Sequence, residues 1–166
     1  MALNPTFFNV PNRFAEPARD AGLLLLRITL SGLFIFHGGA KFANGIDGFA
    51  GYLASLNVPF PLLNAYLAAG TEVLAGLAVL VGLFTRLAAV PLVVTMAVAF
   101  FLAKGAELNP QGGGGEYALA LGLVAVTLIL TGPGRFNVTT PLLHALAGKT
   151  KSSSRETPNA ALASTA

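Results

Sequence analysis

The stretch PLLNAYLAAGTEVLAGLAVLVGL, residues 61–83, decides the fold. It contains one charged residue, Glu72, near its middle, and it follows the helix breaker Pro59-Phe60-Pro61. At 1.5 Å per residue, a helix of this length covers roughly 30 Å, which is the thickness of the hydrocarbon core of a bilayer. The sequence therefore predicts a membrane-spanning helix that carries one acidic group inside it.

Three more apolar stretches have comparable lengths, and the last of them ends at Gly132-Pro133-Gly134. We expect spans at about 21–43, 62–83, 87–104 and 116–132. The predicted fold is an all-α integral membrane four-helix bundle over residues 21–134, preceded by an N-terminal cytoplasmic or interfacial segment, 1–20. Two short interfacial helices are also expected. One follows the helical spacing of Ile46, Phe49, Leu53 and Leu56 on the outer face.

The second interfacial helix is expected on the inner face, within residues 135–149. Thr140 is its expected N-cap, Pro141 its first residue and Gly148 its C-cap. Residues 150–166 lack apolar periodicity and are predicted to form a disordered tail.

The composition excludes several classes of protein. Of the 166 residues, 10% are charged, and only nine charged residues lie between Ala21 and Gly148. Soluble domains are about 25% charged, so a water-soluble enzyme is excluded, as is a nucleic-acid binder despite the net charge of +3. The sequence contains no cysteine, which excludes thiol chemistry, disulfides and cysteine-based metal sites within it.

The distribution of basic residues predicts the orientation. On one side of the predicted bundle the loops and ends carry most of the Lys and Arg residues, namely Arg13, Arg19, Arg86, Arg135, Lys149, Lys151 and Arg155. The other side carries only Lys41 and Lys104. The positive-inside rule then places both termini in the cytoplasm, as an even number of spans requires.

Glu72 is the most informative residue inside the spans, because an acidic group at mid-bilayer costs about 2.5–3.5 kcal/mol on insertion scales. One face of its helix carries small residues around it, whereas the other carries Leu67, Leu74, Leu77 and Val81. We therefore expect Glu72 to face the bundle and to pair with Arg27 of the first span. Arg27 shares one helical direction with four other residues, namely Ser31, Phe34, Gly38 and Lys41. A structural and a functional role for this pair both stay open.

A second polar cluster is expected in the outer half, formed by His37, Lys41, Glu107, Glu116 and Tyr117. Lys41 and Glu116 lie near the same boundary, which favours a salt bridge between them or a mouth for a polar headgroup. His37 is expected to be a hydrogen-bonded histidine of the bundle. No metal site is predicted, because His144 belongs to the opposite side.

Several motifs occur in a distinctive order along residues 23–137. They are Arg27 followed by Gly38-Gly39-Ala40-Lys41-Phe42, then Val58-Pro59-Phe60-Pro61, Glu72 with Ala75-Gly76-Leu77 and Gly82-Leu83-Phe84-Thr85-Arg86-Leu87-Ala88-Ala89, Gly114-Gly115-Glu116-Tyr117-Ala118-Leu119, and Gly132-Pro133-Gly134-Arg135-Phe136. This ordered set resembles the DoxX family of small four-helix bacterial membrane proteins. The resemblance implies a multi-pass protein of the bacterial plasma (inner) membrane, labelled an oxidoreductase subunit and linked to quinone metabolism.

By the same resemblance, Arg27, Lys41, Glu72 and Glu116 are functional candidates. The acid that usually follows the Gly-Pro-Gly turn is absent, because residues 136–139 read Phe-Asn-Val-Thr.

Three functions remain as hypotheses, and no catalytic residue is assigned. The first is an accessory subunit of a quinone-linked redox system, whose cavity would be lined by Phe34, Phe36, His37, Glu72 and Tyr117. Because no motif for flavin, haem or an iron–sulfur cluster is present, electrons would come from a redox partner or the quinone. The second is a scaffold subunit for another membrane complex, and the third a small-molecule transporter. The expected surroundings are the lipid bilayer and a protein partner, without nucleic acid.

Overall fold

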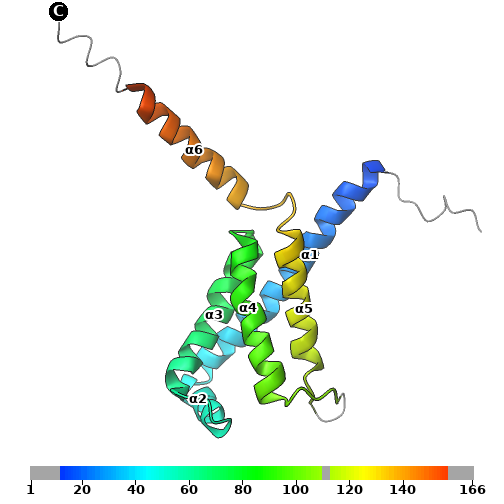
Figure 1. Ribbon diagram of the computed structural model, residues 1–166, viewed down its shortest axis with the longest axis vertical. Coiled ribbons are helices and arrows are strands. Elements are labelled where there is room, and N and C mark those ends of the chain that lie inside the picture. Colours follow the sequence, from blue (N-terminus) through cyan, green and yellow to red (C-terminus); the bar gives the residue numbers. More distant parts are fainter. Residues whose placement is uncertain (1–11, 110–112, 157–166) are drawn as a thin grey trace, which may run out of the picture.

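The structure is a computed structural model that describes residues 12–109 and 113–156, with side chains described for 15–109 and 113–147. All regular elements in these residues are helices, as predicted. Figure 1 shows their order, which is α1 (Asn12–Ala43), α2 (Ile46–Ser55), α3 (Pro61–Val81), α4 (Thr85–Val98) with its π-helical continuation η2 (Ala99–Ala103), α5 (Glu116–Thr131) and α6 (Thr139–Glu156).

Helices α1, α3, α4 and α5 contribute to one apolar core. Buried residues from all four helices form it, namely Leu23, Leu30, Phe34, Ala75, Val79, Ala89, Leu92, Leu121, Ala125 and Leu128. Many large apolar side chains of these helices are exposed instead, among them Leu25, Leu74, Leu87 and Leu130. A surface of this kind suits lipid, because acyl chains are as apolar as leucine.

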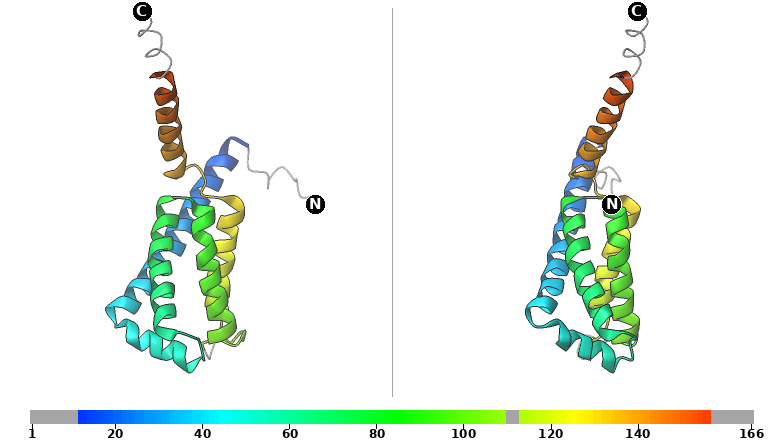
Figure 2. Two further views of the ribbon diagram at one scale, coloured as in Figure 1. Left: turned by 60° about the vertical axis from the view of Figure 1, so that its left-hand side comes forward. Right: turned by 90° about the vertical axis from the view of Figure 1, so that its left-hand side faces the viewer.

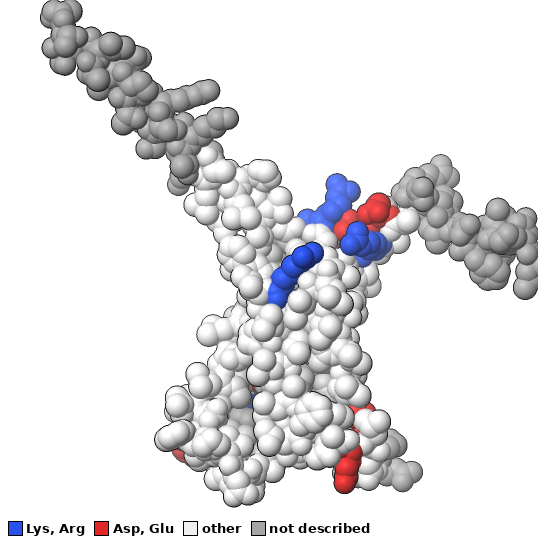
Figure 3. Space-filling model, viewed as in Figure 1, with Lys and Arg blue, Asp and Glu red and all other residues white. Residues whose placement is uncertain are grey.

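Within the part of the chain that the structure describes, three helices are long and apolar enough to cross a membrane: Ala15–Ala43, Pro61–Val81 and Thr85–Ala103. Helix α5 is apolar but shorter, with 16 residues. On the face drawn in Figure 3, charged side chains gather toward the two ends of the molecule, and the surface between them is uncharged. The distribution is that of a membrane protein.

The two ends of the helix bundle differ in construction. At one end, here called the turn end, residues 82–84 join α3 to α4 and residues 132–138 join α5 to α6 (Figure 2). Gly82 and Phe84 adopt left-handed backbone conformations there, with φ of 75° and 43°. Thr139 joins the two connections: its hydroxyl donates to the Gly82 carbonyl at 2.7 Å and accepts from the Phe84 N–H at 2.7 Å.

At the opposite end, here called the α2 end, the short helix α2 packs against α3. Its buried residues Ile46, Ala50 and Leu53 form a second small core with Ala65 and Ala69 of α3. The helical spacing in the sequence therefore predicted this helix, which ends at Ser55, just before Leu56.

Helix α6 begins at Thr139, one residue before the expected N-cap, and extends away from the other helices (Figures 1 and 2). It continues past Gly148 to Glu156, so the expected C-cap at Gly148 is wrong. A lone glycine weakens a helix by about 1 kcal/mol relative to alanine and does not by itself end it. Of the expected tail, residues 150–156 are helical and 157–166 lie outside the described residues.

Candidate functional site

The polar stripe of α1 faces the bundle interior, as its periodicity predicted. Arg27, Ser31, Phe34 and Gly38 are buried, and Lys41 is half-buried at the end of the stripe. A residue outside the stripe's predicted members, Asp20, lies on the same face and is also buried. Its spacing of seven residues from Arg27 was a usable signal, because positions i and i+7 share a helical face.

The face of α3 that surrounds Glu72 is also as predicted. Glu72 is buried among small residues, whereas Leu67, Leu74, Leu77 and Val81 are exposed. The predicted lipid-facing and bundle-facing sides of this helix are therefore both confirmed.

Gly38 sets the register between α1 and α3. A Cβ atom at Gly38 would lie 2.8 Å from Glu72 Cβ and 2.9 Å from the Ala69 carbonyl oxygen. The two backbones thus approach closely at this point, which places Glu72 level with Gly38. Lys41 is three residues farther along α1, nearly one turn, whereas Arg27 is eleven residues away in the other direction, a rise of about 16 Å.

The partner of Glu72 is consequently Lys41, and the expected Arg27–Glu72 pair is wrong. Lys41 Nζ donates a hydrogen bond to Glu72 Oε2 and forms a salt bridge with it. The Glu72 side chain is 4% exposed and that of Lys41 is 22% exposed. Lys41 Nζ also lies 4.9 Å from the centroid of the Phe49 ring, within the range of a cation–π contact.

Arg27 binds backbone carbonyls at the turn end instead. Its Nε donates to Val79 O at 2.8 Å and its Nη2 donates to Leu80 O at 2.6 Å, both in the last turn of α3. Its Nη1 donates to Pro133 O at 3.0 Å and also to Phe136 O, in the connection after α5. The guanidinium therefore binds carbonyls in the last turn of α3, of which Val79 O also accepts from the Gly82 N–H, and it holds that end against the α5–α6 connection.

Two neighbouring contacts close the turn end around Arg27. A Cβ atom at Gly82 would lie 2.7 Å from Arg27 Nη2 and 2.7 Å from Asn137 Cβ. The Arg135 N–H donates to Asp20 Oδ1 at 3.1 Å, and Arg135 Nε lies 3.9 Å from Asp20 Oδ2. Arg27 with its four carbonyls is called the Arg27 cluster below. Sequence reasoning missed its partners because backbone carbonyls carry no residue-type signal.

The expected cluster at the other end is divided in the structure. His37 Nε2 and the Tyr117 hydroxyl lie 3.3 Å apart, with ring centroids separated by 5.9 Å. The expected Lys41–Glu116 salt bridge is wrong, because Lys41 binds Glu72. Glu116 begins α5, where its charge favours the helix N-terminus, and its buried Oε1 has no hydrogen-bond partner among the described residues.

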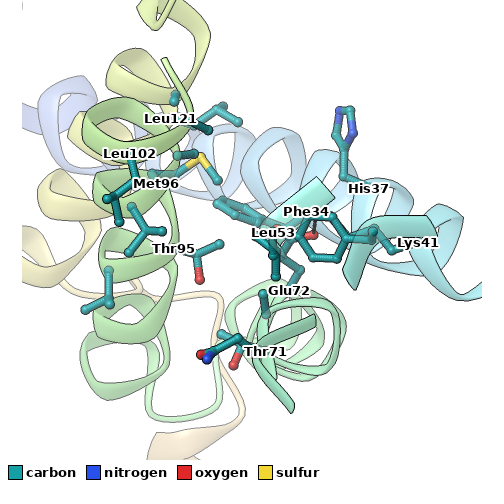
Figure 4. Close-up of a pocket in the computed structure, with 18 of the residues that line it drawn as sticks. Phe34, His37, Lys41, Leu53, Thr71, Glu72, Thr95, Met96, Leu102 and Leu121 are labelled. Atoms are coloured by element: carbon teal, nitrogen blue, oxygen red, sulfur yellow. Dashed lines mark hydrogen bonds and ion pairs between the residues drawn. The ribbon is translucent and has the colours of Figure 1, made fainter. Parts of the chain in front are cut away.

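A cavity of about 660 Å³ lies beside the Lys41–Glu72 pair, between α1, α2, α3, α4 with η2, and the start of α5. Of the six predicted site residues, four line it, namely His37, Lys41, Glu72 and Tyr117. Arg27 and Glu116 do not line it. Figure 4 shows Glu72 and Lys41 at one side of the space, with Thr71 on α3 and Thr95 on α4.

The apolar lining of this cavity includes Phe34, as predicted. Phe36 does not line it, because its side chain points outward and is 70% exposed. Thr71 and Thr95 were missed, although a hydroxyl residue isolated in an apolar span is a signal for an inward polar position.

The cavity has the chemistry of a site for a mostly apolar ligand with polar atoms at one end. Cavities that bind small molecules measure roughly 300–1,000 Å³ and combine apolar walls with a few polar groups. Lys41 carries three N–H donors, and the Glu72 carboxylate can accept about four hydrogen bonds. Their mutual hydrogen bond uses one of each, so the pair can still donate to and accept from a ligand. The cavity with this pair is called the Lys41–Glu72 cavity below.

Comparison with known proteins gives one matching family. Residues 22–105 match the sequence profile of the family described as DoxX. An uncharacterized protein of Haemophilus influenzae is 34% identical over 123 residues, which cover 72% of this chain and 89% of that protein. No solved structure gives a significant match.

Two other relatives have informative names. The Bacillus subtilis protein named "Putative oxidoreductase CatD" is 33% identical over 113 residues, covering 68% of this chain and 81% of that protein. The Escherichia coli "Inner membrane protein YphA" is 42% identical over 69 residues, covering 42% of this chain and 49% of that protein. The profile match contains Arg27, Lys41 and Glu72 but ends before Glu116.

Proposed function

The chain belongs to the DoxX family of membrane proteins, and on that premise we propose that it is a small accessory subunit of a quinone-linked redox system in the bacterial inner membrane. It crosses the membrane four times, with both termini in the cytoplasm. The observation that carries the redox part of the proposal is the Lys41–Glu72 cavity, an apolar space of about 660 Å³ beside a buried ion pair.

The proposed topology draws support from how the basic residues gather. Arg19 near the start of α1, Arg86 at the start of α4 and Arg135 after α5 all belong to the turn end. The positive-inside rule assigns that end to the cytoplasm. Helix α5 has 16 residues and a rise of about 24 Å, which is shorter than the hydrocarbon core of a typical bilayer. In the proposed topology the bilayer is thinner around α5, or residues that flank the helix also lie within the membrane.

The cavity fits a quinone ring in size and polarity. A quinone head group is a flat apolar ring with a carbonyl oxygen at each of two positions, and a quinol carries hydroxyls there. Lys41 Nζ can donate to a carbonyl oxygen, and the Glu72 carboxylate can accept from a hydroxyl. The name of the Bacillus subtilis relative supports a redox role. In this proposal a partner protein delivers two electrons to the quinone, or the quinol delivers two electrons to the partner protein.

The experiment is purification in mild detergent, followed by mass spectrometry of co-purified proteins and lipids and an assay of quinone reduction by the purified material. We expect a stoichiometric redox partner, bound quinone and quinone-dependent activity. The activity should fall in the double variant K41M/E72Q and stay unchanged in R19Q, an exposed arginine far from the cavity. Active quinone reduction that is indifferent to K41M/E72Q would remove the cavity from the proposal, and absence of both partner and activity would contradict the redox role.

One observation favours the scaffold hypothesis as a second candidate. Helix α6 extends away from the bundle at the turn end, and its residues Leu142 and Leu143 are exposed (Figure 1). A scaffold would use this helix to bind its partner. Deleting residues 141–166 would then abolish co-purification of the partner, whereas K41M/E72Q would leave it intact.

A further inference from the structure

The Lys41–Glu72 cavity has two different borders. At the α2 end its lining includes side chains of α2 and the residue after it, namely Phe49, Tyr52, Leu53 and Leu56, together with the exposed side chain of Lys104. Helix α2 contacts α3 and α1 at this end (Figure 1). Because Tyr52 and Lys104 are exposed there, this border of the cavity carries polar groups.

The border formed by α3 and α4 is open toward the outside of the bundle. Five apolar residues line the cavity and are also exposed on the molecular surface, namely Leu67, Val90, Val94, Val98 and Leu102. Leu67 is 56% exposed and Leu102 is 55% exposed. The cavity wall is thus continuous with the apolar surface that faces the bilayer.

The arrangement of the two helices explains this opening. Helices α3 and α4 are joined at the turn end and lie farther apart toward the α2 end (Figure 1). Along this part α4 contains Pro91, which lacks an N–H, and it changes to the π-helix Ala99–Ala103. Both features interrupt regular helix hydrogen bonding and are common causes of helix bending. Residues from both segments line the cavity.

We infer that the cavity is filled sideways from the bilayer, through a slot between Leu67 of α3 and Leu102 of η2, by an uncharged lipid-soluble ring molecule with oxygen substituents. The inference rests on the proposed function for the identity of that ligand as a quinone, and it adds the route of entry. A charged, water-soluble substrate would have to leave water and cross acyl chains to use this slot, at a cost of several kcal/mol.

The polar groups beyond the slot suit such a ligand. The Thr95 hydroxyl donates to the Pro91 carbonyl at 3.0 Å, so its oxygen remains as an acceptor. The Lys41–Glu72 pair then supplies the charged donor and acceptor at the far side of the cavity (Figure 4). A ring that enters between α3 and α4 passes Thr71 and Thr95 before it reaches the pair.

The test uses a fluorescent reporter inside the cavity. The sequence contains no tryptophan, so the single substitution Tyr52→Trp at the cavity wall gives a unique signal. The protein is placed in nanodiscs of phosphatidylethanolamine and phosphatidylglycerol, and the probe is decylubiquinone, which quenches tryptophan. Stopped-flow mixing gives the association rate, and titration gives the dissociation constant.

The matched pair of variants is L67F/L102F, which narrows the slot, and L74F/L87F, which makes the same changes at exposed positions of α3 and α4 that do not line the cavity. We expect saturable quenching in the reporter protein. L67F/L102F should slow association about tenfold, with less effect on the dissociation constant, because gating changes rates rather than the bound contacts. L74F/L87F should leave both unchanged, and K41M/E72Q should weaken binding about tenfold or more.

Equal association rates in L67F/L102F and L74F/L87F would overturn the slot, and so would the absence of saturable quenching. Equal association rates would leave the proposed redox role untouched, whereas the absence of saturable quenching would also remove the cavity as its quinone site; the role itself is judged by the quinone-dependent activity of the co-purified complex. Slowed binding in L67F/L102F together with an inactive complex would contradict the redox role and leave the route of entry in place.

Discussion

Two buried charged groups in this molecule have opposite surroundings. In the Arg27 cluster, one guanidinium makes four hydrogen bonds to carbonyls of α3 and of the α5–α6 connection, and Gly82 lies close to both the guanidinium and Asn137. In the Lys41–Glu72 cavity, two charges share one hydrogen bond and border about 660 Å³ of open space. The first group is enclosed, and the second is accessible to a ligand.

The difference shows which buried charge serves the fold and which is available for chemistry. Removing a charge from water is costly, and the cost is offset only when hydrogen bonds replace those to water. Arg27 uses four of its five N–H donors on backbone carbonyls, so it holds the turn end together. Lys41 and Glu72 replace the hydrogen bonds to water in part, so a ligand can complete their hydrogen bonding.

The largest expected effect comes from Arg27→Gln, which would leave four carbonyls short of a donor. We expect a loss of about 3–5 kcal/mol in the free energy of unfolding, because removing one partner of a buried charged network leaves the other unsatisfied. Thermal unfolding in detergent, followed by circular dichroism, measures it. Arg19→Gln on the same helix is the control, since that side chain is exposed and its contact with Glu16 is 3.8 Å. Similar melting temperatures for the two variants would contradict the structural role of Arg27.

The ion pair should behave differently, because each of its two charges is balanced by the other, and removing both leaves no uncompensated buried charge. Lys41→Gln or Glu72→Gln alone should destabilise the protein by about 2–3 kcal/mol, somewhat less than for Arg27, since part of Lys41 is exposed. The double variant K41Q/E72Q should recover most of this loss and still bind decylubiquinone about tenfold or more weakly than the unchanged protein. A double-mutant cycle from chemical unfolding gives the coupling energy. A double variant as unstable as the sum of the singles would give no coupling energy and would contradict the interaction between Lys41 and Glu72.

Gly38→Ala should cost about 1–3 kcal/mol, because its new methyl group would overlap Glu72 Cβ, Ala69 O and Val73 Cγ2, all within 2.9 Å. The neighbouring change Gly39→Ala is the control, since nothing lies within 4 Å of a Cβ there. Chemical unfolding of both variants measures the difference between their free energies of unfolding. If Gly38→Ala is as stable as Gly39→Ala, the close approach of α1 and α3 does not set the register of the ion pair.

The smallest effect is expected for Tyr117→Phe, which removes the 3.3 Å contact between the hydroxyl and His37 Nε2. Because both side chains are exposed, the free energy of unfolding should change by less than about 1 kcal/mol. The affinity for decylubiquinone is the more informative measurement, since both residues line the cavity. A loss of affinity as large as that of K41M/E72Q would make the His37–Tyr117 contact part of the binding site.

The directions of these side chains could be predicted from the sequence, and their partners could not. A period of 3.6 residues places Arg27, Gly38 and Lys41 on one face of α1 and Glu72 on the small-residue face of α3, and each of these faces is confirmed. The period gives an angle around the helix. It does not give the height of one helix relative to another.

The position of α1 along the bundle axis relative to α3 decides which cation reaches Glu72. The predicted Arg27–Glu72 pair assumed that both spans begin at the membrane boundary that the sequence suggests, whereas the close contact at Gly38 places Glu72 near Lys41. The same limit applies to Lys41 and Glu116. The start of α5 follows a glycine-rich segment, and sequence periodicity places no constraint on where such a segment brings the next helix.

The sequence by itself determined the class of the protein, its apolar helices, their inward faces and the DoxX resemblance, because these depend on composition, local periodicity and motif order. The tertiary structure decided that Arg27 binds carbonyls, that Lys41 binds Glu72, and that an apolar cavity lies beside this pair. These features depend on backbone carbonyls and on contacts between helices distant in the chain. Neither is visible in the residue types, because every residue carries a carbonyl and the relative heights of helices are set by packing.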